Sequence, residues 1–170
     1  MGPRGTTVRL IDHGLAGLDD RDMHGSIPQG PDQQRSRSGP GSERPRLVIA
    51  DDDVRDRATL RRVLEGEQME IISEASDGME AVSVVLREQP DVIVLDASMP
   101  RDEGLRAASR IHASSAPTQV VLLTDRPVQE IARDAEELGV YIVIDKDADA
   151  TLIVDAVKGA VAYKRSKESS

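Results

Sequence analysis

The stretch Pro90-Asp91-Val92-Ile93-Val94-Leu95-Asp96 decides the fold, because it is a short aliphatic run that ends abruptly on an acid. Three other aliphatic runs also end on polar residues: Leu47 to Ala50 before Asp51-Asp52, Val120 to Leu123 before Thr124, and Val140 to Ile144 before Asp145-Lys146. Neighbouring parallel strands would bring these polar ends to one rim of a sheet, and open α/β sheets bind ligands at the carboxyl ends of their strands.

The sequence between these runs has the apolar spacing of helices, with buried positions three and four residues apart. Strands separated by helices of ten or more residues predict β-α-β units and a parallel sheet. We expect strands near 46–50, 69–74, 91–96, 118–124 and 140–144, and a last helix near 149–163. The chain is therefore predicted to have one α/β domain over residues 45–163 and a frayed polar end over 164–170.

Residues 1–44 are predicted to form a disordered or flexible tail, because eight Gly and four Pro are scattered among polar residues. A small apolar island interrupts this tail at Val8, Leu10, Ile11 and Leu15. A short helix would explain the island, and so would an untranslated leader that precedes a true start at Met23.

Composition excludes several classes of protein. The 170 residues contain no Cys, which rules out disulfides and zinc thiolate sites. No apolar run approaches the roughly 18 residues of a membrane span, so a cytoplasmic protein without a membrane partner is expected. The net charge of -9 and the presence of only two aromatic residues argue against direct nucleic acid contact by this domain.

The polar strand ends suit phosphoryl chemistry. Carboxylates held close together repel one another, and oxygen ligands without His or Cys favour a hard ion such as Mg²⁺. Asp96 could attack phosphorus, while Thr124 and Lys146 could stabilise the transferred group. Taken singly, an Asp run after a strand can be only a turn with a helix cap, and Thr or Lys at a strand end can be a solvated turn residue. Their joint placement at corresponding strand ends favours a site.

These residues resemble the receiver domain of two-component response regulators. The resemblance covers residues 46 to about 161. Its motifs are Val48-Ile49-Ala50-Asp51-Asp52 with Arg57, Glu74-Ala75-Ser76-Asp77-Gly78, and Pro90 to Asp96 with Met99-Pro100 and Gly104. The wording of the first two motifs is similar to that of the subfamily that usually carries a helix-turn-helix output.

The resemblance implies a flavodoxin-like, doubly wound sheet of five parallel strands in the order 2-1-3-4-5. It implies that Asp96 accepts a phosphoryl group from a sensor histidine kinase or a small phosphodonor. Mg²⁺ would be held by Asp51, Asp52, Asp96 and the backbone carbonyl of Ser98. Thr124 would move to the phosphate, and Lys146 would pair with it. The chain would catalyse only its own phosphorylation and dephosphorylation, and a homodimer is possible.

Two positions depart from the family pattern. Val143 stands where the family commonly has an aromatic residue that follows the Thr, and Tyr141 is expected on the same side of the strand by period two. Asp125 stands where a small residue is usual, and it adds an acid beside a carboxylate-rich site. We expect Asp125 to slow phosphorylation or to increase the need for Mg²⁺.

Three other interpretations remain open at this point. A haloacid-dehalogenase-like phosphohydrolase would need a second Asp where Ser98 stands and its acid pair late in the chain. A receiver fold that has lost phosphorylation could act as a docking or dimerisation module, which Val143 and Asp125 favour. The receiver part of a DNA-binding transcriptional regulator would have the same sequence pattern.

Overall fold

A computed structural model describes residues 8–10 and 43–169, whose secondary structure alternates between strands and helices. The elements are β1 (Val8–Leu10), β2 (Arg46–Ala50), α1 (Val54–Glu65), β3 (Glu70–Ala75), α2 (Gly78–Glu88), β4 (Val92–Asp96), the 3-10 turn η2 (Pro100–Asp102), α3 (Glu103–Ala113), β5 (Gln119–Thr124), α4 (Val128–Glu137), β6 (Ile142–Asp145) and α5 (Ala150–Glu168).

The sheet has the order β1-β6-β5-β4-β2-β3, and all its strands except β1 are parallel to their neighbours. Counted from Arg46 onward, the five parallel strands have the predicted order 2-1-3-4-5. This prediction is therefore confirmed, and the strands lie where the aliphatic runs placed them.

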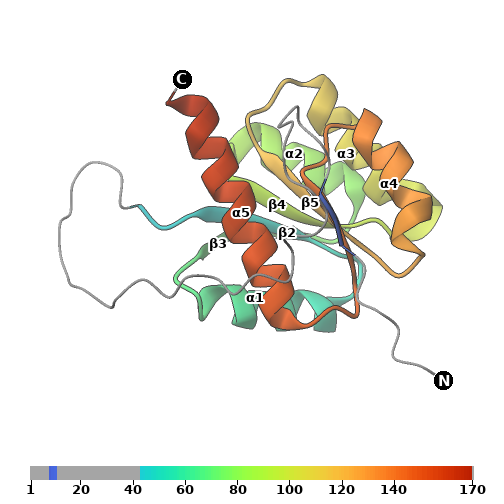
Figure 1. Ribbon diagram of the computed structural model, residues 1–170, viewed down its shortest axis with the longest axis horizontal. Helices are drawn as coiled ribbons and strands as arrows, with labels where there is room; N and C mark the ends of the chain where they lie inside the picture. Colours follow the sequence, from blue (N-terminus) through green and yellow to red (C-terminus); the bar gives the residue numbers. More distant parts are fainter. Residues whose placement is uncertain (1–7, 11–42, 170) are drawn as a thin grey trace, which may run out of the picture. The chain divides into compact units, whose positions relative to one another are not determined.

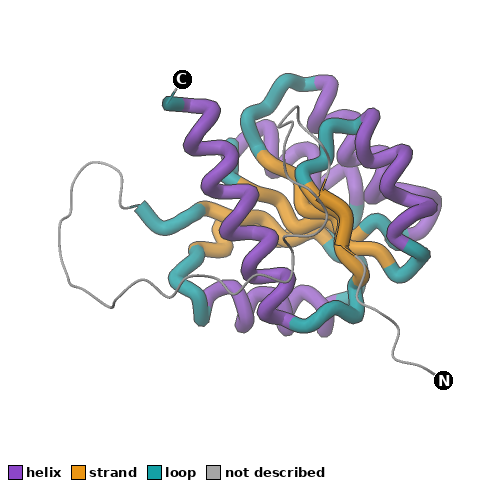
Figure 2. Tube along the Cα trace, in the orientation of Figure 1, coloured by secondary structure: helices purple, strands orange, loops and turns teal. Residues whose placement is uncertain are grey.

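The core is divided between the two faces of the sheet. Helices α1 and α5 cover one face, and α2, α3 and α4 cover the other (Figure 1). Figure 2 shows the strands between these two helical layers. Strand β4 is buried along its whole length, as expected for a central parallel strand covered on both faces.

Strand β1 is a difference from the predicted tail. Val8–Leu10 pairs with β6 in an antiparallel ladder, with Val8 opposite Ile144 and Leu10 opposite Ile142. The short apolar island is thus extended at these residues, and not helical, because the edge of β6 offers unpaired backbone groups to a short strand. The rest of the predicted tail, apart from Glu43 and Arg44, lies outside the described residues.

Helix α5 also differs from the prediction, because it continues to Glu168 and does not fray after Tyr163. Lys164 lies 2.7 Å from Asp91 and 3.0 Å from Glu168, measured from its Nζ to a carboxylate oxygen of each. Asp91 precedes β4 and also accepts a hydrogen bond from the backbone N–H of Arg46. A buried, charge-paired Lys164 therefore attaches the final turns of α5 to the sheet. Ser170 lies outside the described residues.

No helix in the described part of the chain combines the length and the apolar character that a membrane span requires.

Candidate phosphoryl and metal site

Four of the predicted site residues lie side by side at the carboxyl ends of adjacent strands. The register pairs Ala50 with Leu95, Asp96 with Leu123 and Thr124 with Asp145. Asp51 and Lys146 directly follow β2 and β6. The strand ends therefore place Asp51, Asp96, Thr124 and Lys146 along one rim, and the first three are almost completely buried.

Asp52 and Asp53 occupy the turn between β2 and α1. Carboxylate oxygens of Asp51, Asp52 and Asp96 lie within 4.8 Å of one another. Asp53 caps α1, because its side chain accepts hydrogen bonds from the backbone N–H groups of Arg55 and Asp56. These hydrogen bonds, that from Arg55 foremost, lower the pKa of Asp53. The Asp53 carboxylate is thus hydrogen-bonded to the helix, whereas the carboxylates of Asp51, Asp52 and Asp96 lie close to one another.

Lys146 neutralises part of this acidic cluster. Its Nζ lies 2.9 Å from Asp51 Oδ2, 3.0 Å from Asp96 Oδ2 and 2.9 Å from Asp56 Oδ2. Partial burial acts to lower the pKa of Lys146, but its close pairing with the carboxylates of Asp51, Asp56 and Asp96 outweighs this effect and raises the pKa. The ammonium group therefore stays charged throughout the physiological range.

Asp56 was missed by sequence reasoning. It lies in the first turn of α1, where an acid is ordinary because it complements the helix dipole. Its side chain is partly exposed, yet it reaches Lys146 from the solvent side. The signal in the sequence was its closeness to the acid pair, four residues after Asp52, which places it in the first turn of the helix that follows the pair.

The residues present fit a hard divalent cation. Asp51 Oδ2 is fully buried and, despite its ion-pair distance to Lys146, accepts no hydrogen bond from the described residues. Burial raises the pKa of Asp51 from 3.8 to about 6, and the nearby charge of Asp96 adds to this effect. A buried oxygen without a hydrogen-bond donor, beside two other carboxylates, is a cation ligand of the kind that Mg²⁺ takes.

Ser98 and Thr124 have partners of their own at the rim. The Ser98 backbone N–H donates to Asp96 Oδ1 over 2.8 Å, and the Ser98 hydroxyl donates to Asp125 Oδ1 over 2.6 Å. The Thr124 hydroxyl accepts a hydrogen bond from the Arg126 backbone N–H over 3.0 Å. Ser98, Asp125 and Arg126 line a hollow of about 290 Å³ beside Asp96. Access to Asp96 from this side therefore passes the exposed Asp125 carboxylate.

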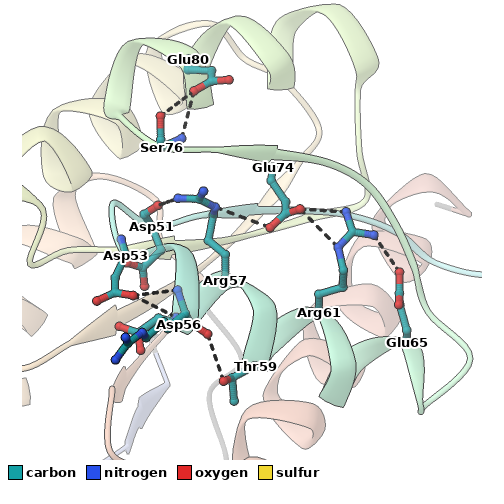
Figure 3. Close-up of polar contacts among 11 residues, drawn as sticks. Asp51, Asp53, Asp56, Arg57, Thr59, Arg61, Glu65, Glu74, Ser76 and Glu80 are labelled. Atoms are coloured by element: carbon teal, nitrogen blue, oxygen red, sulfur yellow. Dashed lines mark hydrogen bonds and ion pairs between the residues drawn. The ribbon is translucent and has the colours of Figure 1, made fainter.

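Arg57 and Arg61 of α1 both pair with Glu74 of β3, and Arg57 also contacts Asp51 (Figure 3). Arg57 Nη1 donates to the backbone carbonyl of Asp51 over 2.7 Å, and its Nε lies 3.5 Å from Glu74 Oε1. Arg61 also pairs with Glu74, at 2.9 Å. Since Glu74 belongs to β3, these contacts tie the carboxyl ends of β2 and β3 to the first helix.

The expectation for Tyr141 was wrong. Val143 is fully buried in the core beneath α2, α3 and α4, whereas Tyr141 packs with the core on the α5 side. The Tyr141 ring centroid lies 5.5 Å from that of Tyr163 on α5. Tyr141 precedes the first residue of β6 and lies in a bend, so the alternation of the strand does not extend to it. Tyr141 therefore does not replace the aromatic side chain missing at Val143.

The pKa of Asp51 predicts an unusual pH dependence of stability. Because this carboxyl group has a pKa of about 6 when folded and 3.8 when unfolded, the folded protein binds the proton more tightly. As pH rises from about 4 through about 6, the unfolded chain loses this proton before the folded protein does, so the stability of the metal-free protein falls by on the order of 1 to 3 kcal/mol across this window. Urea denaturation in EDTA would measure this slope. Asp51→Asn should flatten it and the exposed Asp155→Asn should not, whereas an unchanged slope in Asp51→Asn would contradict the assignment.

Asp125 is expected to slow the approach of a phosphodonor to Asp96. Asp125→Ala should raise the rate of phosphorylation by acetyl phosphate at fixed Mg²⁺ by roughly 2- to 5-fold, the effect of one exposed like charge. The rate would be followed by intact mass spectrometry. Asp134→Ala, which removes an exposed acid from α4, is the matched control and should be phosphorylated at the parent rate. Equal rates for Asp125→Ala and the parent would contradict the proposed effect of Asp125.

Comparison with known proteins agrees with this geometry. A family model described as the response regulator receiver domain matches residues 47–158. The transcriptional regulatory protein PdtaR of Mycobacterium tuberculosis is 33% identical over 120 residues, which cover 71% of this chain and 58% of PdtaR. The chemotaxis protein CheY of Listeria monocytogenes is 29% identical over 115 residues, which cover 68% of this chain and 97% of CheY. The chain thus spans little more than half of PdtaR but nearly all of CheY.

Solved structures of the same architecture include two of direct interest. The signal receiver domain of the putative response regulator NarL from Mycobacterium tuberculosis superposes with a TM-score of 0.67 at 30% identity, covering 71% of this chain and 98% of that domain. The CheX–CheY–BeF3–Mg²⁺ complex from Borrelia burgdorferi gives a TM-score of 0.63 at 25% identity, covering 67% of this chain and 87% of the matched chain.

Proposed function

This chain belongs to the response regulator receiver domain family, and on that premise we propose that it works as a Mg²⁺-dependent switch that is phosphorylated on Asp96. The observation that carries the proposal is the buried position of Asp96 between Asp51 and Lys146 at the rim of the sheet. A carboxylate fixed in direction, with a cation beside it and two further acids within 4.8 Å, suits attack on phosphorus.

In the proposed reaction, a carboxylate oxygen of Asp96 forms a bond to phosphorus while the bond from phosphorus to the donor's leaving group breaks. The product is an acyl phosphate on the chain itself, so the proposed chemistry is confined to its own phosphorylation and dephosphorylation. Asp51, Asp52, Asp96 and the backbone carbonyl of Ser98 would hold Mg²⁺. The ion would offset the negative charge of the phosphoryl oxygens and of the crowded carboxylates.

Lys146 and Thr124 would respond to the new group. Lys146 Nζ already lies 3.0 Å from Asp96 Oδ2, so it is placed to pair with a phosphoryl oxygen attached at this end of β4. The Thr124 hydroxyl would exchange its hydrogen bond with Arg126 for one to the phosphoryl group. Because Val143 has no ring to follow Thr124, we propose that the change is transmitted through the loop after β5 and not through an aromatic rotamer.

The proposed phosphodonor is a sensor histidine kinase in the cytoplasm, or a small acyl phosphate. The name of the Borrelia complex pairs CheY with BeF3, Mg²⁺ and CheX, which supports Mg²⁺ as the ion and protein binding as the output. The proposed output is partner binding or homodimerisation, without direct nucleic acid contact by this domain. Since PdtaR is a transcriptional regulator and extends beyond the matched region, the receiver part of such a regulator is an alternative context.

The experiment that tests the proposal is intact mass spectrometry after incubation with acetyl phosphate. We expect a single phosphoryl adduct with Mg²⁺ and none when EDTA replaces the metal. A docking module that does not depend on phosphorylation is the second candidate, favoured by the Ser98–Asp125 hydrogen bond across the approach to Asp96 and by the buried Val143. No adduct with any donor would favour that second candidate.

A further inference from the structure

A second hollow lies between the beginning of α2 and the exposed face of α3. Its volume is about 340 Å³, within the range of small-molecule sites, and three of its lining residues are Arg101, Arg106 and Arg110. A chain with a net charge of -9 therefore concentrates three guanidinium groups around one concave surface. Basic side chains thus predominate at this surface, although acidic residues outnumber basic residues in the whole chain.

Arg106 and Arg110 are available to a ligand. They lie four residues apart on α3, so their side chains leave the same face of the helix. Both are exposed, and neither makes an ion pair or side-chain hydrogen bond with any residue of the described ranges. Arginine guanidinium groups form bidentate hydrogen bonds with phosphate and carboxylate, so two of them one turn apart suit two linked anionic groups.

Glu103 places a carboxylate of the protein in the lining of the hollow. Its Oε1 lies 3.3 Å from Arg101 Nη2, and its Oε2 accepts a long hydrogen bond from the Gly78 backbone N–H over 3.4 Å. The backbones approach closely here, since a Cβ on Gly78 would lie 2.6 Å from the Glu103 carbonyl oxygen. A carboxylate of the protein itself thus occupies part of a surface whose polar groups are mainly donors.

The remaining wall is apolar. The Met79 side chain is 75% exposed at the edge of the hollow, and the buried Ala107 lies on its α3 side. Methionine adapts to flat or irregular ligand surfaces, and guanidinium groups also stack on aromatic rings. The hollow therefore combines paired cationic groups for anions with a surface for an uncharged body.

We infer that this hollow binds a small molecule that carries a diphosphate group joined to an apolar or aromatic body. Arg106 and Arg110 hold the phosphate groups, Arg101 contacts the group nearest Glu103, and Met79 covers the body. Arg101 also lines the hollow beside Asp96, so the two hollows share one side chain. The inference does not depend on phosphorylation of Asp96, because no metal ligand or phosphoacceptor residue takes part in it.

Adenosine diphosphate is the probe, titrated into the full chain in EDTA and followed by amide chemical shifts in two-dimensional NMR. Saturable shifts are expected at Gly78, Met79 and Ala107. Loss of two charge-assisted contacts in Arg106→Gln/Arg110→Gln should weaken binding by about 10-fold or more. Adenosine, which lacks the phosphates, should not bind.

The matched control is Arg62→Gln/Arg133→Gln, which removes the same charge from two exposed positions on α1 and α4. Its affinity for the probe should stay within about 2-fold of the parent, because neither residue lines the hollow. A general effect of net charge would instead weaken binding in both double variants alike. Unshifted spectra up to about 5 mM probe would overturn the inference, as would equal weakening in the two double variants. Amide spectra of each variant without probe establish that its fold is retained.

Discussion

Asp96→Asn is expected to abolish the phosphoryl adduct that the parent acquires from acetyl phosphate and Mg²⁺. An amide oxygen is a poor nucleophile, and Asp51, the other buried carboxylate beside Lys146 at this rim, is the proposed metal ligand and not the proposed acceptor. Intact mass spectrometry measures the adduct directly, and the expected change is from a single added phosphoryl group to none.

The control for this experiment is Asp155→Asn, which makes the same chemical change at an exposed position on α5. It should be phosphorylated at the parent rate. An adduct of equal yield in Asp96→Asn would mean that another side chain accepts the phosphoryl group, and the proposed acceptor would then be rejected while the family assignment would stand.

Gly104→Ala is expected to destabilise the fold by about 3 kcal/mol or more. Helix α3 packs so closely on the end of β4 at this point that an added Cβ would overlap the Asp96 carbonyl oxygen and lie 2.8 Å from Ala97 Cα. Both obstacles are backbone atoms, so a side-chain rotation cannot relieve them. The free energy of unfolding from urea denaturation measures the effect.

Gly66→Ala is the matched control, because Gly66 has φ -61° and ψ -20° after α1 and a Cβ there would lie 3.3 Å from the nearest atom. We expect its stability to remain within about 1 kcal/mol of the parent. If Gly104→Ala proved as stable as Gly66→Ala, the close packing of α3 against Asp96 and Ala97 would be contradicted. Lowered phosphorylation of a folded Gly104→Ala would instead indicate that the approach positions Asp96.

The parallel sheet could be predicted because its information is local. Each aliphatic run is long enough for one strand, and each ends on a residue that is unfavourable in the core, such as Asp96 or Thr124. Once the strands are ordered, the positions of Asp51, Asp96, Thr124 and Lys146 along one rim follow from the topology alone. The structure agrees with this reasoning in both the sheet order and the adjacency of the strand ends.

The features that were missed depend on contacts between residues far apart in the chain. The end of α5 resembles a polar tail until Lys164 is placed against Asp91, 73 residues away. Asp56 is an ordinary first-turn acid until the phase of α1 brings it to Lys146. Tyr141 was misplaced because period two was applied across the beginning of a strand. In each case the local pattern is correct for an isolated element, and the packing of two elements changes its meaning.

The pairing of β1 with β6 has a consequence for the order in which the chain folds. Val8–Leu10 leaves the ribosome long before its partner Ile142–Ile144 has been synthesised, and four parallel strands and four α-helices separate them. Such a nonlocal pairing gains nothing until the intervening sheet has formed. We therefore expect β1, the earliest strand of the described chain to be made, to be the last to join the sheet.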